Sequence, residues 1–335
     1  MIPQERTTAV TRGLREAFGV TEFEDISTIT KGQTNSLVFR IVVLGTPYLL
    51  KIITRAEDPT RHYTCMRAAA DAGLAPSVRY TNTEDHVSIT DFAGTSPFSV
   101  SEARARLPLV LRTLHALPPF ARAPFNTTST FLLTKGPASD GFLQKFQAGN
   151  ILPKNVQEEL FARYAEVAAV YPYGDTEMVS SHNDLYKPDN ILFDGQQVWL
   201  VDWEAAFLND RYADLAVVAN QIVTNAVEEG AYLAAYFGAP PEPYQAARFF
   251  LMQQLAHIFY TMAFLFLSGA PVDWNEAVPT FRDFQQGVWA GEIDLADPLV
   301  KLVHGRVHCE QLLQNVNQPR YREALKLVGA RRAVA

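Results

Sequence analysis

Residues 178–204 read MVSSHNDLYKPDNILFDGQQVWLVDWE, and this stretch decides the fold. Its centre predicts a β-hairpin, because the ILF and VWLV segments favour strands and DGQQ between them favours a turn. Pairing the strands about Gln196 places Asn190 opposite Asp202. Directly opposed residues have Cβ atoms about 4.5–5.5 Å apart, so an amide and a carboxylate should meet at one end of the hairpin.

Asn190 and Asp202 offer hard oxygen ligands, the kind that magnesium takes when it is bound to phosphates. Just upstream, His182-Asn183-Asp184 leaves a strand-like segment and enters a loop, so Asp184 presents a carboxylate near the same point. A carboxylate in that position can act as a general base. We interpret His182 as a residue that braces the loop. The stretch therefore predicts a magnesium site beside a base.

The first 92 residues predict a small antiparallel β-sheet combined with helix, because short β-rich segments alternate there with turn-forming residues. Strands are expected at 26–30, 36–44, 48–53, 77–80 and 86–90, and helices at 3–18 and 58–72. The AGTSPF segment at 93–98 carries Gly, Pro and Ser together and is interpreted as a connector.

The rest of the chain predicts a larger, mainly helical part that contains the hairpin. Helices are expected at 100–117, 139–149, 154–170, 210–236, 242–268, 275–290 and 296–315. The predicted fold class is α+β, with a small sheet lobe over 1–92, a connector over 93–98 and a helical lobe over 99–335.

The composition fits a globular protein and argues against nucleic acid as a partner. The 335 residues are 48% hydrophobic and 19% charged, and 29 Lys and Arg against 36 Asp and Glu give a formal charge of −7. Residues 1–92 hold 10 basic and 11 acidic side chains, so the 19 and 25 that remain give the helical lobe an excess of six acids. That excess is compatible with a cationic ligand.

Membrane insertion and export are not predicted. The N-terminus mixes charges into its first turns, and the most apolar run, Leu255 to Leu267, has 13 residues where a spanning helix needs about 18. We expect a cytoplasmic protein with this helix in its core.

Cys65 and Cys309 lie far apart in sequence and are expected to be buried free thiols.

The motif HNDLYKPDN, followed by LVDWE, resembles the catalytic loop and the metal-binding Asp of protein-kinase-like phosphotransferases. The trailing VDWEAAFLNDRYADLA is similar to choline/ethanolamine kinase-like members of the aminoglycoside phosphotransferase superfamily. The two-lobe plan matches the bilobal protein-kinase-like fold of these proteins over nearly the whole chain. The motif is specific for the superfamily and much less specific for the substrate.

The resemblance implies a role for each matching residue. Asp184 would accept or orient the proton of the attacking hydroxyl, and Asn190 and Asp202 would hold magnesium against the phosphates of ATP. Lys51, on the third predicted strand, would pair with the α- and β-phosphates. The other residues implied in nucleotide binding are Gly32 and Asn35 in a turn and Asp91 and Phe92 at the connector.

Two features depart from the family pattern. One more residue separates Asp184 from Asn190 than in the common family loop, so the role of Asn190 depends on the PDN match. The helix after Lys51 should offer a carboxylate to that lysine, but its central residues contain none. Lys51 would then be held by the phosphates alone or by a substitute among Glu57, Asp58 and Asp71.

Asp214 lies in a predicted helix whose N-cap is Asn209 or Asp210. Its carboxylate is expected either to orient the catalytic loop or to serve a plain capping or solvated role, and both remain open.

The acceptor is predicted from aromatic and acidic residues. A quaternary ammonium is held by aromatic faces, since it cannot donate hydrogen bonds. The helix QQLAHIFYTMAFLF supplies aromatic residues where the resembled choline kinases carry a tryptophan-rich helix, although such a stripe is also typical of core packing. The candidate contacts are Phe259, Tyr260, Phe264, Trp203, Glu204 and Trp274.

The sequence therefore predicts an ATP- and magnesium-dependent kinase that phosphorylates a hydroxyl of a small, amine-bearing molecule such as choline or ethanolamine. The alternatives are an aminoglycoside-type antibiotic kinase or other small-alcohol kinase, and a pseudokinase that binds nucleotide without transfer. GxxxxGK[ST], GxGxxG, GxSxG and HExxH do not occur in the sequence, so P-loop, dinucleotide-fold, hydrolase and zinc-peptidase functions have no support.

Overall fold

The computed structural model describes residues 2–29, 36–122, 137–149, 151–173, 178–269 and 273–332. The chain forms two compact units, here called unit 1 (Met1–Phe98 and Asp189–Ala206) and unit 2 (Ser99–Pro188 and Phe207–Ala335). Unit 2 begins where the predicted connector ends, whereas the hairpin belongs to unit 1. The predicted nucleotide-binding residues Gly32 and Asn35 lie outside the described residues.

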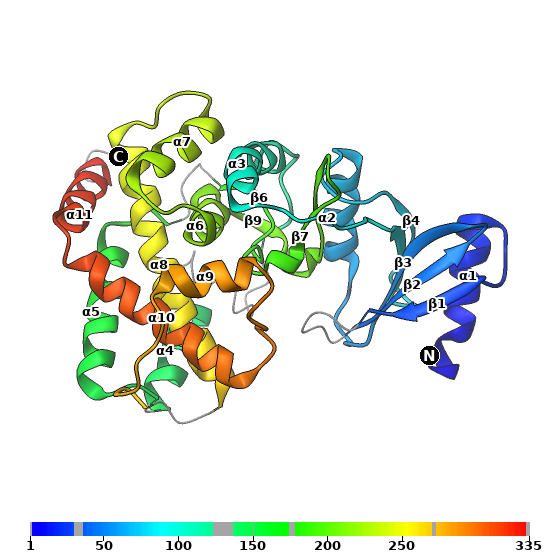
Figure 1. Cartoon of the computed structure of the whole chain (residues 1–335), viewed down its shortest axis with the longest axis horizontal. Helices are drawn as coiled ribbons and strands as arrows, with labels where there is room; N and C mark the ends of the chain where they lie inside the picture. The colour runs from blue at the N-terminus through cyan, green and yellow to red at the C-terminus, as the bar shows by residue number, and fades with distance from the viewer. Residues whose placement is uncertain are drawn as a thin grey trace. The chain divides into compact units, whose positions relative to one another are not determined.

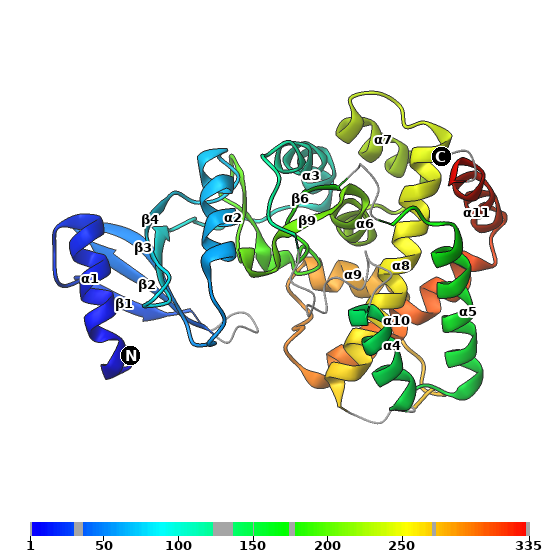
Figure 2. The ribbon, with the colours of Figure 1, turned by 180° about the vertical axis from the view of Figure 1, so that it is seen from behind.

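Unit 1 contains a five-stranded antiparallel sheet with the strand order β1-β2-β3-β5-β4. The strands are β1 (Asp25–Thr28), β2 (Ser36–Val43), β3 (Thr46–Ile53), β4 (Val78–Asn82) and β5 (Val87–Asp91). Helix α1 (Thr7–Phe18), which follows the short helix η1 (Gln4–Arg6), lies against one face of this sheet (Figures 1 and 2). Leu14 of α1 shares a hydrophobic core there with Ile41 and Leu50.

A helix and a hairpin complete unit 1, and they are α2 (Thr60–Asp71), β7 (Ile191–Phe193) and β8 (Val198–Leu200). Backbone hydrogen bonds join the hairpin to the N-terminal segment: Leu200 N donates to Leu74 O at 2.7 Å, and Ser96 N donates to Phe193 O at 2.6 Å. The Phe98 ring stacks on Phe193 with 4.7 Å between centroids. These contacts explain why the hairpin folds with the N-terminal sheet.

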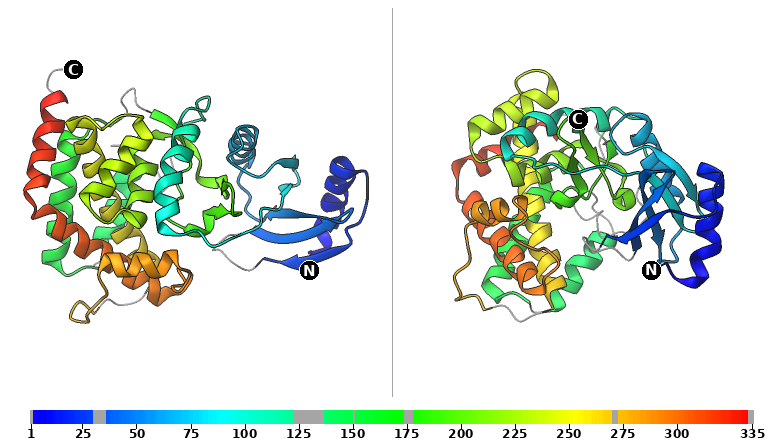
Figure 3. Two further views of the ribbon diagram at one scale, coloured as in Figure 1. Left: turned by 45° about the horizontal axis from the view of Figure 1, so that its top comes forward. Right: turned by 45° about the vertical axis from the view of Figure 1, so that its right-hand side comes forward.

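Unit 2 is mainly helical, and its helices are α3 (Val100–His115), α4 (Pro137–Ala148), α5 (Lys154–Val170), α6 (Arg211–Ile222), α7 (Ala226–Phe237), α8 (Pro243–Ser268), α9 (Phe281–Trp289), α10 (Pro298–Val316) and α11 (Pro319–Arg332). A two-stranded antiparallel sheet pairs β6 (Met178–Ser181) with β9 (Phe207–Asp210). Helix α10 crosses α8, and α11 lies beside α5, where Tyr321 donates to Glu166 at 2.9 Å (Figures 1 and 3).

Several elements differ from the sequence prediction. The single helix expected over 210–236 is two helices, because the Asn225 side chain accepts the N–H groups of Val227 and Glu228 and thereby starts α7. Strand β9 and helix α11 are additional to the predicted elements, and α9 begins later than predicted, at Phe281.

Helix α8 contains the apolar run that the sequence predicts to be a core helix. It is long and apolar enough to cross a membrane by length and composition, but 72% of its most apolar window is buried inside the protein. Burial of this extent is typical of a core helix. The free thiols of Cys65 and Cys309 are also buried, as predicted.

Candidate active site

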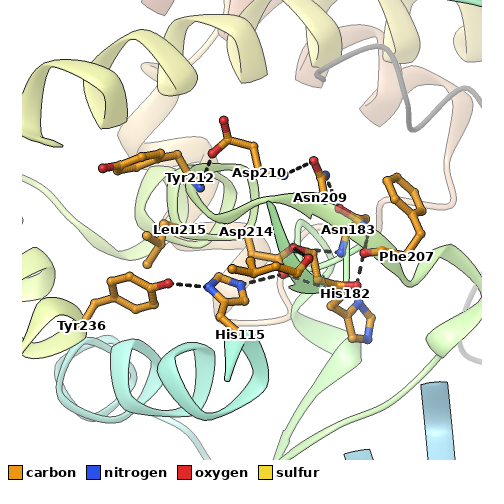
Figure 4. A network of polar contacts seen from close by, with 12 residues as sticks. His115, His182, Asn183, Phe207, Asn209, Asp210, Tyr212, Asp214, Leu215 and Tyr236 are labelled. Atoms are coloured by element: carbon orange, nitrogen blue, oxygen red, sulfur yellow. Dashed lines mark hydrogen bonds and ion pairs between the residues drawn. The ribbon is translucent and has the colours of Figure 1, made fainter. Parts of the chain in front are cut away.

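The catalytic-loop sequence begins where strand β6 ends, and a buried carboxylate fixes its backbone (Figure 4). Asp214, on α6, accepts the N–H of His182 through Oδ2 and the N–H of Asn183 through Oδ1, both at 2.8 Å. Asn183 has a left-handed φ of 66°, a conformation that Asn adopts more readily than most residues. The chain therefore turns sharply just before Asp184.

The Asp214 carboxylate is itself held in its ionised form. Burial acts to raise its pKa, but the hydrogen bond and charge of His115, together with His182, outweigh burial and keep the pKa below its usual value. His115 Nε2 lies 3.3 Å from Asp214 Oδ2, and His115 Nδ1 lies 2.7 Å from the Tyr236 hydroxyl. The structure thus resolves the open question about Asp214: its carboxylate orients the loop.

Strand β9 also supports the loop. The Asn209 amide donates to Asn183 Oδ1, and the Asn183 amide lies 3.4 Å from Phe207 O (Figure 4). Asp210, the last residue of the strand, caps α6 by accepting Tyr212 N–H at 2.9 Å. The strand that the sequence analysis missed therefore brings the loop and the start of α6 together.

Asp184 is half-buried and lies beside a lysine of its own loop. Lys187 Nζ is 3.3 Å from Asp184 Oδ2 and 5.2 Å from the centroid of the Tyr186 ring. The next residue, Leu185, is buried, and its carbonyl oxygen accepts the Gln221 amide at 2.7 Å. Leu185 and Tyr186 form a turn.

The hairpin register differs by one residue from the predicted register. Asn190 lies opposite Val201 rather than opposite Asp202, and Val201 N donates to Asn190 O at 3.0 Å. The turn is the reason: Asp194 N donates to Gln197 O, which centres the turn between two residues instead of on one. Because strand side chains alternate between faces, this shift places the Asn190 and Asp202 side chains differently from the prediction.

Lys51 lies between two carboxylates. It is 8% exposed on β3, and its Nζ is 2.8 Å from Asp202 Oδ1 and 2.7 Å from Glu204 Oε1. Asp202 has a left-handed φ of 66° and leads into the short helix η4 (Trp203–Ala205), which brings both carboxylates to the lysine. Neither carboxylate comes from the segment around α2, where the sequence analysis sought one.

Two arginines around α2 hold Glu204 in place. Arg61 donates to the backbone carbonyl of Glu204 at 2.8 Å, and Arg55 pairs with the Glu204 carboxylate. His62 is buried, and desolvation with the charge of Lys51 lowers its pKa to about 3, so it is neutral. The segment around α2 therefore contributes cations to Glu204 instead of an anion to Lys51.

The two connector residues predicted to contact nucleotide have local partners in unit 1. The Asp91 carboxylate pairs with the Arg79 guanidinium, with Oδ1 2.6 Å from Nε. The Phe92 ring lies 5.7 Å from the Arg40 guanidinium carbon. Their side chains are thus engaged within the sheet unit.

Aromatic side chains of α8 gather beside the catalytic loop within unit 2. The Tyr260 ring is 5.1 Å from Tyr186 and 5.6 Å from Phe264, and Phe259 packs on the same cluster. Burial, then the charges of Tyr186 and Asp184, raise the pKa of the Tyr260 hydroxyl well above its usual value. Three of the predicted acceptor contacts therefore lie together near Asp184.

The other predicted acceptor contacts have different neighbours. Trp203 is 1% exposed and donates to Leu200 O at 3.1 Å, so its ring is part of the core of unit 1. Glu204 is engaged by Lys51 and Arg55, as described above. Both side chains thus have partners within unit 1. The Trp274 ring lies 5.2 Å from the Arg306 guanidinium carbon.

The side chains of Asn190 and Asp202 fit magnesium in the kind of donor they supply. Both offer oxygen, and they lie one register step apart at the end of the hairpin. Within the described part of the chain, no group of three or more His, Cys, Asp or Glu is placed to hold a metal ion. A phosphate-bound magnesium needs only one or two protein ligands, since phosphate and water supply the rest.

Comparison with known proteins places this geometry in a family. Residues 25–250 match the model of the phosphotransferase enzyme family. In sequence, no curated protein matches the chain.

Solved structures with a similar fold extend the comparison. A choline/ethanolamine kinase family protein from Mesorhizobium loti has 19% identity and a TM-score of 0.64, covering 97% of this chain and 99% of that chain. A choline kinase from Cryptosporidium parvum has 12% identity and a TM-score of 0.62, covering 95% and 99%. A spectinomycin phosphotransferase in complex with ADP and spectinomycin has 13% identity and a TM-score of 0.53, covering 90% and 98%.

These similarities confirm the predicted fold class, a mixed α+β protein-kinase-like fold with a small antiparallel sheet and a larger helical part. Because the family match spans more than half of the chain, the protein belongs to the phosphotransferase enzyme family.

Proposed function

We propose that this phosphotransferase is an ATP- and magnesium-dependent kinase that phosphorylates a hydroxyl of a small amine-bearing molecule such as choline or ethanolamine. The observation that carries the proposal is the buried Asp214 carboxylate, which holds the two backbone N–H groups directly before Asp184. A general base works only when its carboxylate is held in position for the proton it accepts.

In the proposed reaction, Asp184 accepts the proton of the acceptor hydroxyl while the hydroxyl oxygen forms a bond to the γ-phosphorus. The bond from that phosphorus to the bridging oxygen breaks and leaves ADP. Lys51 supplies positive charge to the α- and β-phosphates. Asn190 and Asp202 would hold magnesium, which would neutralise phosphate charge.

An amine-bearing acceptor is supported by the loop around Asp184. The Lys187 ammonium lies against both the Asp184 carboxylate and the Tyr186 ring, so this loop accommodates a cation between a carboxylate and an aromatic face. The cluster of Tyr186, Tyr260 and Phe264 adds further aromatic faces that suit a cation. The choline kinases of similar fold are named for an acceptor of this kind.

The test is an ADP-release assay over choline, ethanolamine, homoserine, aminoglycosides and neutral sugars. The Asp184→Asn variant should lower kcat by about 10²–10⁴-fold, because the general base is lost. Glu292→Gln is the control, since this exposed carboxylate lies outside the motif and its loss should leave kcat unchanged.

A thermal-shift titration with ATP and magnesium separates binding from transfer. Wild type and both variants should be stabilised by nucleotide through mass action. Turnover of neutral sugars alone would exclude an amine-bearing acceptor, and turnover of aminoglycosides alone would identify an antibiotic kinase instead of a choline or ethanolamine kinase. Stabilisation without turnover of any acceptor would identify a pseudokinase, and substantial turnover by Asp184→Asn would remove Asp184 from the base role.

A further inference from the structure

Helix α6 holds the catalytic loop on both sides of Asp184. On the N-terminal side, the Asp214 carboxylate accepts the two backbone N–H groups directly before Asp184, both at 2.8 Å (Figure 4). On the C-terminal side, Gln221 Nε2 donates to the carbonyl oxygen of Leu185 at 2.7 Å. The proposed reaction assigns no role to Gln221.

Asp214 and Gln221 lie seven residues apart on α6. Seven residues make about two turns of an α-helix, so both side chains leave the same face. The two residues present complementary groups there, because a carboxylate accepts hydrogen bonds and an amide N–H group donates them. Both are buried, with 1% and 8% of their surface exposed. One face of one helix thus fixes the loop backbone at two points, with Asp184 between them.

Two carbonyl groups fix the orientation of the Gln221 amide. Its Nε2 also donates to Val217 O, one turn earlier in α6, at 3.2 Å. The opposite orientation would set the amide oxygen against both carbonyl oxygens. Gln221 Oε1 is consequently buried without a hydrogen-bond partner among the residues that the structure describes. An unmet buried acceptor is unfavourable, so the contact with Leu185 O is kept at a cost to stability.

The two fixed points leave the backbone of Asp184 little freedom. One residue, Asp184 itself, separates the fixed N–H group of Asn183 from Leu185, and the Leu185 side chain is 1% exposed. A base must be held within reach of the proton that it accepts, and a displacement of about 1 Å can lower a rate by about 10²-fold. We infer, on the basis of the proposed function, that Gln221 is a positioning residue for Asp184, because its hold on Leu185 O directs the Asp184 carboxylate to the acceptor hydroxyl.

Gln221→Met tests this role in the full chain, because it removes the donor and the unmet acceptor and keeps an unbranched side chain. With the acceptor that turns over fastest in the ADP-release assay, kcat should fall by at least about tenfold. The KM for ATP should not change, since Lys51, Asn190 and Asp202 all belong to unit 1. The urea midpoint should change little, because one unmet acceptor, Gln221 Oε1, is exchanged for another, Leu185 O.

Gln254→Met is the matched control. Gln254 is also a buried glutamine, and its Nε2 donates to a carbonyl oxygen one turn earlier in its helix, Phe250 O, at 2.9 Å. Its Oε1 accepts Asn315 Nδ2 at 2.9 Å, so its loss breaks a contact between α8 and α10 instead of one with the loop. Gln254→Met should lower the urea midpoint at least as much as Gln221→Met does and leave kcat unchanged.

A second background separates positioning from a loss of folded protein. If Gln221 acts through Asp184, Gln221→Met should not lower the residual kcat of Asp184→Asn any further, because no base is left to position. A purely structural role would lower kcat by the same factor in both backgrounds.

Hydrogen exchange tests the loop contact independently of the proposed kinase activity. The peptide that contains His182 and Asn183 is followed without nucleotide or acceptor, since the N–H groups of both residues are bonded to Asp214. In Gln221→Met these groups should exchange at least about threefold faster than in wild type, because the loop opens more often. In Gln254→Met they should exchange as in wild type.

Three results would overturn the inference. They are an unchanged exchange rate at His182 and Asn183 in Gln221→Met, an unchanged kcat in this variant, and an equal fall of kcat in the wild-type and Asp184→Asn backgrounds. Faster exchange in Gln221→Met alone, in a chain that phosphorylates none of the acceptors, would instead contradict the proposed function and support the loop contact of Gln221.

Discussion

At the scale of single residues, two carboxylates compensate the positive charge of Lys51. A buried lysine that loses its partners leaves an uncompensated charge, and the cost is several kcal/mol when the site is fully buried. Lys51 has two partners, Asp202 and Glu204, and the second is anchored by Arg55 and by Arg61 through its backbone carbonyl. Glu204 can therefore keep Lys51 in place if Asp202 binds the proposed magnesium.

We predict that Glu204→Gln raises the KM for ATP by about tenfold, because an anion that positions Lys51 is lost, while kcat falls less. Steady-state kinetics with ATP as the varied substrate measures this split. Glu57→Gln is the matched control, since Glu57 is an exposed carboxylate near α2 with no contact to Lys51 in the structure, and it should leave KM unchanged. An unchanged KM for Glu204→Gln together with a raised KM for Glu57→Gln would mean that the carboxylate partner of Lys51 comes from the segment around α2.

The residues of the candidate site differ in how far the sequence predicts them. Lys51 is predictable as a strand residue because its neighbours Leu50 and Ile52 are apolar and the segment is short. Its contact with Glu204 is not predictable, since the two residues lie far apart in the chain and meet only through the left-handed turn at Asp202. The role of Asp214 similarly depends on β9, a strand whose sequence, FLND, contains no β-branched residue to mark it.

At the scale of elements, turns and caps explain the differences from prediction. The hairpin was predicted from its β-rich segments, but its register follows from the hydrogen bond between Asp194 and Gln197, which composition does not reveal. The break between α6 and α7 does have a sequence signal, because Asn225 is a strong N-cap and Glu228 follows three residues later. Local capping chemistry thus outweighs a continuous helical pattern.

Helices α8 and α10 make close contact at a glycine, which gives a prediction for element packing. A Cβ at Gly305 would lie 2.6 Å from Leu265 Cγ and 3.0 Å from Leu265 N. Gly305→Ala should therefore lower the free energy of unfolding by about 1–3 kcal/mol, despite the better helix propensity of Ala.

Gly230 in α7 is the matched control, because a Cβ there meets nothing within 4 Å. Gly230→Ala should raise the free energy of unfolding by about 0.5–1 kcal/mol through helix propensity alone. Urea unfolding measures both variants. Equal stabilisation by the two substitutions would show that α8 and α10 are not packed this closely.

At the scale of the whole molecule, the sequence predicts the division into a sheet part and a helical part but not the composition of each unit. The α+β plan follows from the change of pattern near Phe92 and is confirmed. The hairpin, predicted within the helical lobe, folds with unit 1 because Leu74 and Ser96 bond to its strands. Such long-range hydrogen bonds leave no periodic signal in the sequence.

Three buried histidines of unit 2 predict a molecule that loses stability in mild acid. His257 Nδ1 lies 2.9 Å from His308 Nδ1, and His308 Nε2 lies 3.2 Å from His304 Nε2. Burial lowers the pKa of His257 and His304 from 6.5 to about 3. Burial, with the other two rings, lowers the pKa of His308 well below its usual value.

The sign of the effect follows from the protons that each state binds. Between about pH 6.5 and pH 3 the unfolded chain binds a proton at each of these rings and the folded state does not, so the free energy of unfolding falls as the pH falls. Each ring contributes up to about 1.4 kcal/mol per pH unit, and three together up to about 4 kcal/mol. The fall from about pH 6.5 to about pH 5 would then remove about 6 kcal/mol, which equals the lower end of a typical total stability of about 5–15 kcal/mol.

Urea midpoints measured from about pH 7.5 to pH 5 test this prediction. His304→Gln removes one of four rings with a lowered pKa, since the pKa of His62 is also about 3, and it should reduce the slope of stability against pH by about one quarter. His86→Asn is the matched control, because His86 is partly exposed and has a left-handed φ of 58° that Asn tolerates; its slope should equal that of wild type. Stability that is flat over this range, or an unchanged slope in His304→Gln, would mean that the three rings accept protons within the folded protein.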